Sequence, residues 1–459
     1  TLTCVFAASR SRRDIESGAS TLLREQKTAV IGAGPCGLAA CKTLAEYGLD
    51  FECLESSDEL GGIWTLERGG GGYRSLKTNT STGGMSYSDF PFPGGMPTYP
   101  NAQQMVDYFQ RYADHFQLGD HLRFGSRVSR AIPHTDGTWR VELESGECRG
   151  YSSLVVATGQ YTSPRLPHAL IPGEFSGQHM HVFDYLDATT PVDLRDKRVL
   201  VVGLGSSAAE VAAELCNPQA PAGCASRVFL SARSGRWVLP KIIDGKPLDA
   251  RAPHPSARPP ALIRALPGNS GQWLMRRIMG RLLTSQSARF GGPEALGLPT
   301  PTIAPWEDRP TMSLDFIPAL QAGRIEAHPG IARFDGSVVR FTDDTQVEAD
   351  VILYATGYQL DFPFLSRETL ECEATELELY QRIAHPTHDH LFFVGCCRVM
   401  CAMWPLAEQQ SRWIAKLLSG AFQLPPASKR HRRAIPLAAA LPVICSLYVE
   451  QLRKEAKGF

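Results

Sequence analysis

The stretch that most constrains this chain is 27–38, which reads Lys-Thr-Ala-Val-Ile-Gly-Ala-Gly-Pro-Cys-Gly-Leu. A short β-branched run meets a glycine-rich turn, and a helix-like run follows from Leu38 to about Tyr47. In such a turn the first glycine allows the tight bend, the second lets the backbone approach a pyrophosphate, and the third lets the helix pack closely on the strand. The helix N-terminus then offers free N–H groups to the phosphates. We therefore predict a dinucleotide site formed by Gly32, Ala33, Gly34, Pro35, Cys36 and Gly37.

A glycine turn alone is weak evidence, because it also serves as a plain connection between a strand and a helix. A second apolar run, Phe51–Leu54, follows the helix and ends at Glu55. An acidic residue about 20 residues after the turn is placed to bind a ribose hydroxyl. Glu55 therefore makes the turn a dinucleotide fingerprint.

A second strand–turn–helix pattern opens at Lys197. The buried β run Val199–Val202 leads into Gly203-Leu204-Gly205-Ser206-Ser207-Ala208, and a helical pattern continues to Leu215. Alanine at the third position is one that the fingerprint permits. Two such units imply two dinucleotides, or one dinucleotide plus a structural echo. The fingerprint positions of this second turn are Gly203, Gly205 and Ala208.

The strand that follows the second turn indicates which nicotinamide cofactor binds there. The strand runs from Arg227 to Leu230, and no acidic residue stands at its end. Ser231 and Arg233 stand there instead. A hydroxyl and a guanidinium suit a ribose 2′-phosphate, so the pattern favours NADPH over NADH. The alternative is a solvated basic loop without a ligand.

The composition argues against several function classes. The 47 basic residues balance the 47 acidic ones, so no net field favours nucleic acid or an anionic membrane. No apolar run reaches the roughly 18 residues of a transmembrane helix, and the longest, 434–449, contains two prolines. We expect that run to be buried or to face a partner. The 12 cysteines show no C-x-x-C or zinc-finger spacing, so we expect core thiols, no metal and a cytoplasmic, reducing location.

Two nucleotide sites in one chain point to an electron relay in which hydride passes from NADPH to a flavin. The reduced flavin could reduce a disulfide, pass electrons to a protein or quinone, or react with oxygen. Cys36 and Cys41 are poor candidates for a redox pair, because they lie on the turn and helix that grip the pyrophosphate. Nothing in the sequence excludes electron transfer to a protein or quinone.

Oxygen chemistry at a flavin requires a dry site with amide-type donors rather than a strong acid or base. Asn79, flanked by Thr78 and Thr80, is the best candidate for such a donor. The alternative is that Asn79 is an ordinary turn residue.

At this point the chain resembles a known family, the class B flavin-dependent monooxygenases, and within them the flavin-containing monooxygenases, which oxidise soft nitrogen and sulfur centres. The resemblance runs from about Thr28 to Pro425. It is carried jointly by several motifs, which are individually moderate. These are the two glycine turns with Glu55, then Gly61-Gly62-Ile63-Trp64, Thr78-Asn79-Thr80-Ser81, Ser88-Asp89-Phe90-Pro91-Phe92-Pro93, Ala355-Thr356-Gly357-Tyr358 and Pro405-Leu406-Ala407-Glu408-Gln409-Gln410-Ser411-Arg412-Trp413.

The segment from Phe175 to Tyr185 looks like the family signature F-x-G-x-x-x-H-x-x-x-[FY]. The resemblance gives His181 a structural and gating role at the hinge between domains. Tyr185 favours the flavin-containing group over the Baeyer–Villiger relatives, which usually carry tryptophan there. Leu186 departs from the lysine usual in the flavin-containing group, and Ser206 departs from the asparagine often found in the NADPH turn.

The resemblance implies a monooxygenase that uses FAD, NADPH and O2 and acts through a C4a-hydroperoxyflavin, similar to N,N-dimethylaniline monooxygenase. It implies that Asn79 supports that intermediate. The residues implied to line the FAD are Ile63, Trp64, Asn79 and Thr80, and those implied to begin the helix under the NADPH pyrophosphate are Ser207, Ala208, Ala209 and Glu210.

Two other functions stay open from the sequence, a Baeyer–Villiger ketone monooxygenase and a non-catalytic protein that senses NADPH. The expected partners are a small-molecule substrate and O2, without nucleic acid. A homodimer is left open.

The expected fold is α/β, with two Rossmann-like domains and the NADPH domain inserted into the FAD domain. Residues 1–25 form an N-terminal extension with little intrinsic order. The FAD domain comprises 26–187 and 346–459. The NADPH domain, 188–345, carries a proline-rich insertion, 239–310, which we expect either to cover the active site or to form a partner surface.

Overall fold

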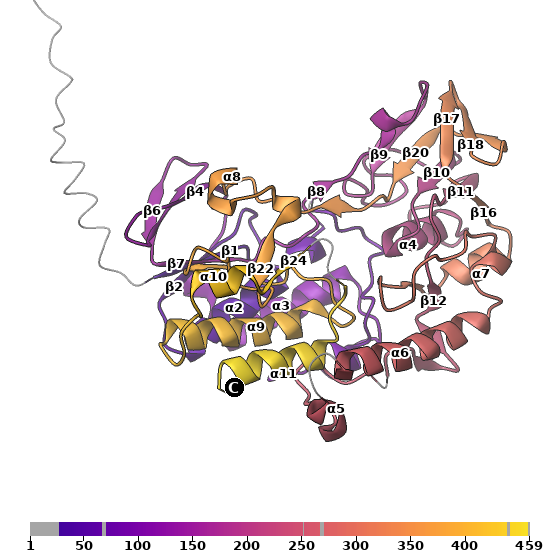
Figure 1. Cartoon of the computed structure of the whole chain (residues 1–459). Coiled ribbons are helices and arrows are strands. Elements are labelled where there is room, and N and C mark those ends of the chain that lie inside the picture. Colours follow the sequence, from indigo (N-terminus) through magenta and orange to yellow (C-terminus); the bar gives the residue numbers. More distant parts are fainter. Residues whose placement is uncertain (1–26, 67–69, 251, 267–269, 438–440, 458–459) are drawn as a thin grey trace, which may run out of the picture.

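The architecture is two parallel β-sheets, each covered by helices, in a computed structural model that describes residues 27–66, 70–250, 252–266, 270–437 and 441–457 (Figure 1). The predicted N-terminal extension lies outside these residues. The first sheet occupies the indigo side of the molecule and the second lies beside α4 and α7 (Figure 1). Separate clusters of buried side chains fill the two halves.

The first sheet has the strand order β23-β7-β1-β2-β3, and all its pairings are parallel. Its central strands are apolar runs buried on both faces, as expected of a covered parallel sheet. Helix α2 connects β1 to β2 along the chain and packs against α9. The elements are β1 (Thr28–Ile31), α2 (Pro35–Glu46), β2 (Phe51–Leu54), α3 (Ala102–His115), β3 (Leu122–Arg123), β7 (Ser153–Val156), β23 (Leu391–Phe393) and α9 (Met403–Leu418).

The second sheet repeats this plan, with the order β16-β11-β10-β20-β9 and parallel pairings throughout. Strands β20, β10, β11 and β16 follow the same order as β7, β1, β2 and β3. The two glycine turns therefore occupy equivalent places in two similar units. The elements are β9 (Gln178–His181), β10 (Arg198–Val202), α4 (Ser206–Leu215), β11 (Arg227–Ser231), α7 (Phe316–Gln321), β16 (Ile325–His328) and β20 (Val351–Tyr354).

The strand pairing corrects the expected domain boundaries. Strand β20 pairs with β10, and β9 pairs with β20, so both belong to the second sheet. The sequence interpretation had placed 178–181 and 351–354 in the first domain. Both strands have only four residues, and nothing in so short a strand specifies which of two parallel sheets it joins. The chain crosses between the sheets after β7 and after β20, where β8 (Ser163–Pro164) and β21 (Tyr358–Gln359) pair with each other.

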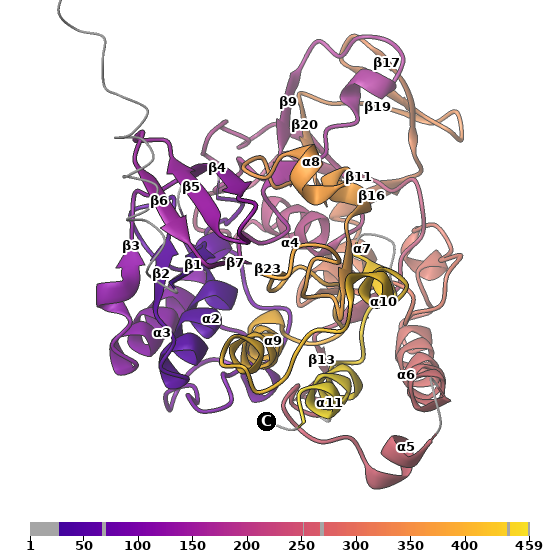
Figure 2. The same ribbon diagram turned by 60° about the vertical axis from the view of Figure 1, so that its left-hand side comes forward.

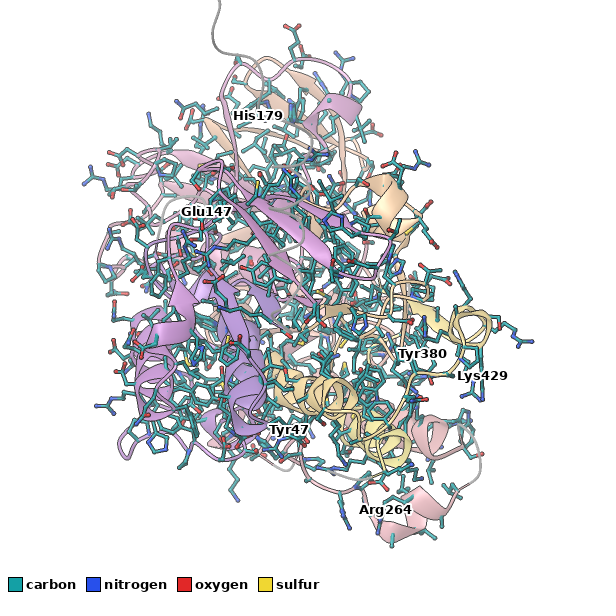
Figure 3. The ribbon with its side chains drawn as sticks, turned by 90° about the vertical axis from the view of Figure 1, so that its left-hand side faces the viewer. Tyr47, Glu147, His179, Arg264, Tyr380 and Lys429 are labelled. Carbon is teal, nitrogen blue, oxygen red and sulfur yellow. A yellow bond between two sulfur atoms is a disulfide. The ribbon has the colours of Figure 1, made fainter. Side chains whose placement is uncertain are left out.

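Smaller elements surround the sheets. Figures 1 and 2 place three antiparallel strands, β4–β6, beside the first sheet and three more, β17–β19, at the far end of the second. The insertion adds two helices, and its Arg264 lies at the opposite end of the molecule from His179 of β9 (Figure 3). These elements are β4 (Val128–Pro133), β5 (Trp139–Leu143), β6 (Cys148–Tyr151), β12 (Val238–Pro240), β13 (Ile242–Ile243), β14 (Lys246–Pro247), α5 (Ala261–Ala265), α6 (Ser270–Ala288), β15 (Thr311–Ser313), β17 (Ile331–Asp335), β18 (Val338–Phe341), β19 (Gln346–Glu348), α8 (Arg367–Leu370), β22 (Glu378–Tyr380), α10 (Ala427–His431), β24 (Ala434–Pro436) and α11 (Cys445–Glu455).

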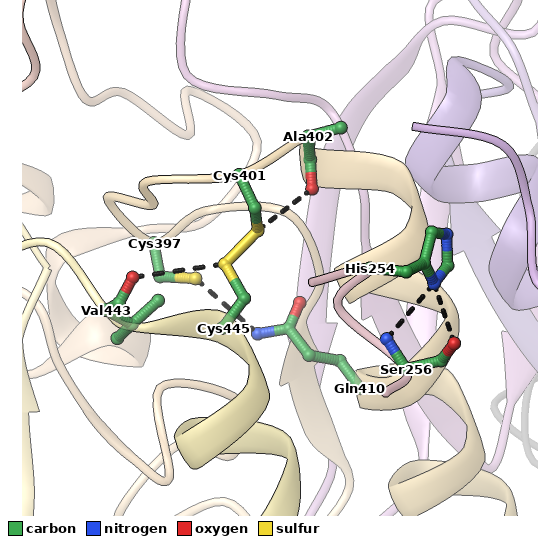
Figure 4. Close-up of a disulfide and its surroundings, with 8 residues drawn as sticks. All are labelled: His254, Ser256, Cys397, Cys401, Ala402, Gln410, Val443 and Cys445. Atoms are coloured by element: carbon green, nitrogen blue, oxygen red, sulfur yellow. Dashed lines mark hydrogen bonds between the residues drawn. A yellow bond between two sulfur atoms is a disulfide. The ribbon is translucent and has the colours of Figure 1, made fainter. Parts of the chain in front are cut away.

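The helix α11 packs on α9, so the last part of the run 434–449, Cys445–Val449, agrees with the expectation of a buried element. Leu441 is exposed, and 438–440 lie outside the described residues. A disulfide joins Cys401, just before α9, to Cys445 at the start of α11 (Figure 4). The expectation that all cysteines are core thiols is therefore wrong for this pair. The two residues are 44 positions apart, and such a separation carries no spacing signal. Nearby, the Gln410 amide donates to the Tyr448 hydroxyl at 3.1 Å, which adds a second link between the two helices.

We expect the Cys401→Ser variant, or reduction of the wild-type protein, to lower the stability of this half by about 2–4 kcal/mol, because the bond closes a long loop in the unfolded chain. The thermal midpoint with and without dithiothreitol measures the effect. Cys148→Ser is the matched control, since Cys148 is an exposed free thiol. An unchanged midpoint in Cys401→Ser contradicts the stabilising role.

Candidate functional site

The first glycine turn is held by backbone contacts. Gly32 has φ +105°, and a Cβ there would lie 2.9 Å from the Ala157 carbonyl oxygen. A Cβ on Gly37 would lie 1.8 Å from the Gly32 oxygen, so helix and turn touch without room for a side chain. Gly34 differs, because its Cβ would meet only Gly62 Cα at 3.6 Å, an ordinary contact. The protein itself therefore leaves room for a side chain at Gly34, and the fingerprint assigns that space to the pyrophosphate.

The N-terminus of α2 presents unpaired donors at this turn. Gly34 is the N-cap, and no side chain caps the helix. Within the described residues the N–H groups of Cys36 and Gly37 make no hydrogen bond, whereas Leu38 N donates to Gly34 O. Free N–H groups and the helix dipole suit a phosphate. Burial raises the pKa of Cys36 to about 12, so this thiol stays protonated and serves packing.

Glu55 is placed as the sequence predicted, at the end of β2 beside the turn. The residue is 7% exposed, and its Oε2 accepts a hydrogen bond from Ala33 N at 2.6 Å. Its Oε1 accepts from the Ser57 N–H at 2.9 Å. A carboxylate has about four acceptor positions, so Oε2 retains capacity for a ribose hydroxyl.

The predicted Ile63-Trp64 segment lies against the same turn. It forms a short 3₁₀ helix, Gly62–Trp64, and Gly61 N donates to Ala33 O at 3.1 Å. The indole of Trp64 is buried and meets Trp404 of α9 edge to face, with ring centroids 6.1 Å apart. This brings the loop and α9 to one side of the glycine turn.

Asn79 is exposed, and in the described part of the chain its side chain makes no hydrogen bond. Its neighbour Thr78 is buried, and the Thr78 Oγ1 has no partner there. Thr80 is half-buried. The segment is anchored by Thr78 N, which donates to Pro100 O at 3.0 Å. The buried hydroxyl of Thr78 without a partner is the environment expected where a polar ligand supplies the missing hydrogen bond, and the exposed amide of Asn79 lies beside it.

Thr158 is a site residue that the sequence interpretation missed. It lies two residues after the end of β7, its Cα lies 3.4 Å from the Cβ position of Gly32, and its buried Oγ1 has no partner among the described residues. Its sequence context, Ala157-Thr158-Gly159, matches the motif Ala355-Thr356-Gly357 and could have indicated the site. These features together fit FAD: unpaired N–H donors at α2, a glycine cradle, Glu55 and two orphaned hydroxyls.

The second glycine turn has the same construction. Gly203 has φ +133°, and a Cβ there would lie 2.4 Å from the Ala355 oxygen, as Gly32 faces Ala157 in the first turn. Gly205 caps α4 without a side-chain bond, and Ala208 is fully buried. The N–H groups of Ser206 and Ser207 form no hydrogen bond within the described residues. The turn therefore offers a second place for a pyrophosphate.

Glu210 makes long-range contacts that the sequence did not predict, and its contact with the cofactor stays a prediction. Its Oε2 accepts from the Tyr73 hydroxyl at 2.6 Å, and its Oε1 accepts from Lys241 Nζ at 2.6 Å. Both oxygens are thus bonded to the segment before Asn79 and to the insertion. The sequence assigns Glu210 to the cofactor together with its neighbours at the start of the helix. The periodicity of a helix does not show which distant residue each side chain contacts. Ala209, also predicted here, is buried in the core.

Ser231 and Arg233 are the two residues assigned to the 2′-phosphate, and they differ in burial and in the partners of their side chains. The Ser231 side chain is buried and its hydroxyl donates to Pro329 O at 2.7 Å. Its contact with the phosphate stays a prediction, which requires the hydroxyl to turn away from Pro329 O. Arg233 is exposed at the end of β11, beside Gly330. The nearby Arg236 is ion-paired with Asp308 at 2.6 Å, which leaves Arg233 as the candidate for the phosphate.

His181 ends β9 and is 2% exposed. Its Nδ1 accepts from the Phe183 N–H at 3.0 Å, and its ring meets Tyr358 edge to face at 5.2 Å. The Nε2 has no partner among the described residues. Burial lowers the pKa of His181, so the ring is neutral at pH 7. It pairs with Tyr354, the last residue of β20, after which the chain leaves the second sheet, and its gating role stays a prediction.

None of the helices in the described part of the chain combines the length and apolar character needed to cross a membrane.

The family model described as "flavin-binding monooxygenase-like" matches residues 25–436. Human flavin-containing monooxygenase 1 is 33% identical over 427 residues, covering 88% of this chain and 75% of that protein. The rat protein dimethylaniline monooxygenase [N-oxide-forming] 2 is 32% identical over 419 residues, covering 87% of this chain and 74% of that protein.

Solved structures show the same fold. An S-allyl-L-cysteine S-oxygenase from Allium sativum superposes with a TM-score of 0.66 at 22% identity, covering 95% of this chain and 90% of that one. Cyclohexanone monooxygenase bound to ε-caprolactone superposes with a TM-score of 0.69 at 18% identity, covering 94% and 98%. With the two dinucleotide turns and the matched family model, the chain belongs to the flavin-binding monooxygenase family, whose cofactors are FAD and NADPH.

Proposed function

We propose that this protein uses NADPH and O2 to oxygenate soft nitrogen or sulfur centres through a C4a-hydroperoxyflavin. The observation that carries the proposal is Asn79, an exposed amide without a protein partner, in a segment bonded to the second dinucleotide unit through Thr78 and Lys241. The rat relative whose name states N-oxide formation supports the reaction class. Bound FAD would supply the redox chemistry; the chain supplies the binding and the donors described above.

The residues would divide the work as follows. The N–H groups of Cys36 and Gly37 would bind the FAD pyrophosphate, and Glu55 a ribose hydroxyl. The N-terminus of α4 would bind the NADPH pyrophosphate, and Arg233 its 2′-phosphate. Asn79 would donate its amide N–H to an oxygen atom at the flavin and would keep that site from losing peroxide to water.

A single screen tests the proposal. The purified protein, loaded with FAD, is given NADPH and one amine, one sulfide or one ketone, and oxygen uptake and oxygenated product are measured. Oxygenated amine or sulfide supports the proposal. Product from the ketone alone supports Baeyer–Villiger oxidation, the reaction suggested by the cyclohexanone monooxygenase likeness. NADPH binding without oxygen uptake supports the sensor alternative.

We expect Asn79→Ala to leave flavin reduction by NADPH unchanged and to raise the ratio of peroxide to product about tenfold, the effect of losing one hydrogen bond of about 1.4 kcal/mol. Peroxide and product are quantified per NADPH oxidised. Lys77→Ala, an exposed neighbour, is the control. If oxygenation efficiency is unchanged in Asn79→Ala, the residue has been assigned wrongly.

We expect Arg233→Ala to weaken the binding of NADPH by about 1–3 kcal/mol, because one charge-assisted contact is lost. The KM for NADPH should rise accordingly, while the KM for NADH stays nearly unchanged. The control is Arg227→Ala at the opposite end of β11, where the guanidinium pairs with Glu326. Equal effects on both cofactors in Arg233→Ala show that the residue does not touch the 2′-phosphate.

A cytoplasmic location and a homodimer stay predictions. The Cys401–Cys445 disulfide weighs against a reducing compartment, where such bonds are rare. Fractionation of expressing cells and light scattering of the purified protein test the two predictions.

A further inference from the structure

A short hairpin near the start of the insertion forms hydrogen bonds with the backbone on both sides of Asn79, at Thr78 and Ser81. Strands β13 and β14 pair within 241–249, which we call the clamp hairpin. Leu248 N donates to Lys241 O at 2.9 Å and closes its base. Lys241 and Asp249 lie at the two ends of this hairpin, and each bonds to the backbone near Asn79.

Lys241 holds one side of the segment. Its side chain is 1% exposed, and its Nζ donates to Thr78 O at 3.0 Å and to Glu210 Oε1 at 2.6 Å. The ammonium also lies 5.6 Å from the centre of the Tyr99 ring. Tyr99 in turn donates its hydroxyl to Lys241 O at 2.6 Å. A buried ammonium is costly unless its donors are used, and here the carbonyl of Thr78 is one of its acceptors.

Asp249 holds the other side. Its Oδ2 accepts from Ser81 N at 2.8 Å, and its buried Oδ1 has no partner among the described residues. The backbone is therefore fixed at the carbonyl of Thr78 and at the N–H of Ser81. Only Asn79 and Thr80 lie between these two bonds.

Glu210 connects this clamp to the second dinucleotide unit. It lies one turn into α4, the helix whose N-terminus faces the second glycine turn. Its second oxygen accepts from the hydroxyl of Tyr73, and burial together with Glu210 raises the pKa of Tyr73 well above its usual value, so the phenol remains a donor. One turn further on, Glu214 Oε2 accepts from the Ser75 hydroxyl at 2.5 Å. Helix α4 thus contacts the segment leading to Asn79 at two points and the clamp at a third.

We propose that Lys241 and Asp249 are positioning residues for oxygen transfer, which set the backbone around Asn79 and, through Glu210, tie its placement to the helix that binds NADPH. The inference rests on the proposed function of Asn79. It assigns a role to part of the insertion, for which the sequence left two alternatives. The competing explanation is that Lys241 and Glu210 form a buried ion pair that only stabilises the fold.

Two variants of this pair separate the explanations. Lys241→Met leaves Glu210 buried without its cation and should lower the thermal midpoint. The double variant Lys241→Met/Glu210→Gln removes both charges and keeps an acceptor for the Tyr73 hydroxyl, so it should restore most of the stability. It does not restore the bond to Thr78 O. We therefore expect the double variant to recover the midpoint while it still releases more peroxide than the wild type, on the order of tenfold.

Hydrogen exchange of peptides covering 76–84 gives a measurement independent of turnover. In Lys241→Met and in the double variant we expect faster exchange in this segment, on the order of tenfold, in the FAD-loaded protein with and without NADP⁺. Asp249→Ala should behave in the same way, whereas Asp249→Asn keeps an acceptor for Ser81 N and should stay close to the wild type. Lys246→Met is the matched control, an exposed lysine in the same hairpin.

Wild-type exchange and wild-type peroxide release in the double variant overturn the proposal and leave a structural ion pair. The same result in Asp249→Ala removes the second arm of the clamp. If the wild-type protein oxygenates no substrate, the proposed function fails, but the exchange rates still decide whether Lys241 and Asp249 hold the segment.

Discussion

Gly37→Ala is expected to produce a protein that does not fold around its first dinucleotide site and retains no flavin. The added Cβ would lie 1.8 Å from the oxygen and 2.9 Å from the carbonyl carbon of Gly32. Both are backbone atoms of a residue whose own conformation is fixed by the Ala157 carbonyl, so neither can move aside cheaply. Helix α2 must shift away from β1, and we expect a loss of about 4 kcal/mol or more, since the packing of the first sheet depends on that contact.

The soluble yield, the thermal midpoint and the flavin absorbance of the purified Gly37→Ala protein measure this effect. Gly119→Ala is the control, because a Cβ at Gly119 meets no atom within 4 Å. A yellow Gly37→Ala protein with the midpoint of the wild type contradicts the argument.

The second turn shows that glycine is not required at the third fingerprint position of both turns. Ala208 stands at the position equivalent to Gly37, and its methyl group is fully buried within the core of the second unit. The first glycine is indispensable in both turns, since Gly32 and Gly203 each face a carbonyl from the neighbouring parallel strand. The two units therefore share the bend but differ in how closely the helix approaches it.

Local patterns predicted much of the fold because they act over short distances. The glycine turns and the buried strands beside them follow from periodicity, turn chemistry and close packing of residues near in the sequence. These signals place each glycine turn between the strand and the helix that the sequence indicated.

The features that the sequence could not predict depend on contacts between residues far apart in the chain. The partner of Lys241 is the carbonyl of Thr78, 163 positions away, and that of Tyr73 is Glu210, 137 positions away. The strand β20 joins the second sheet through the register of Val199 with Val351, which no single strand encodes. The hydrogen bond from the Ser231 hydroxyl to Pro329 O, 98 positions away, is another contact that the sequence did not predict.

Gly34→Ala is expected to give a folded protein that binds FAD weakly, whereas Gly37→Ala loses both the fold and the flavin. Gly34 has φ −69° and ψ 176°, which alanine adopts without strain, and its Cβ would meet Gly62 Cα at 3.6 Å. Loss of the N-cap glycine should cost less than about 1 kcal/mol. The methyl group would stand where the pyrophosphate approaches the free N–H groups of Cys36 and Gly37.

We therefore expect the flavin-free Gly34→Ala protein to unfold within a few degrees of the flavin-free wild type while its Kd for FAD rises about 100-fold, or about 2.7 kcal/mol. Titration of both flavin-free proteins with FAD measures the difference, with Gly119→Ala again as the control. Because the protein alone has room for this methyl group, a lost affinity can only come from contact with the ligand. An unchanged Kd places the pyrophosphate elsewhere and removes the basis for assigning FAD to the first turn.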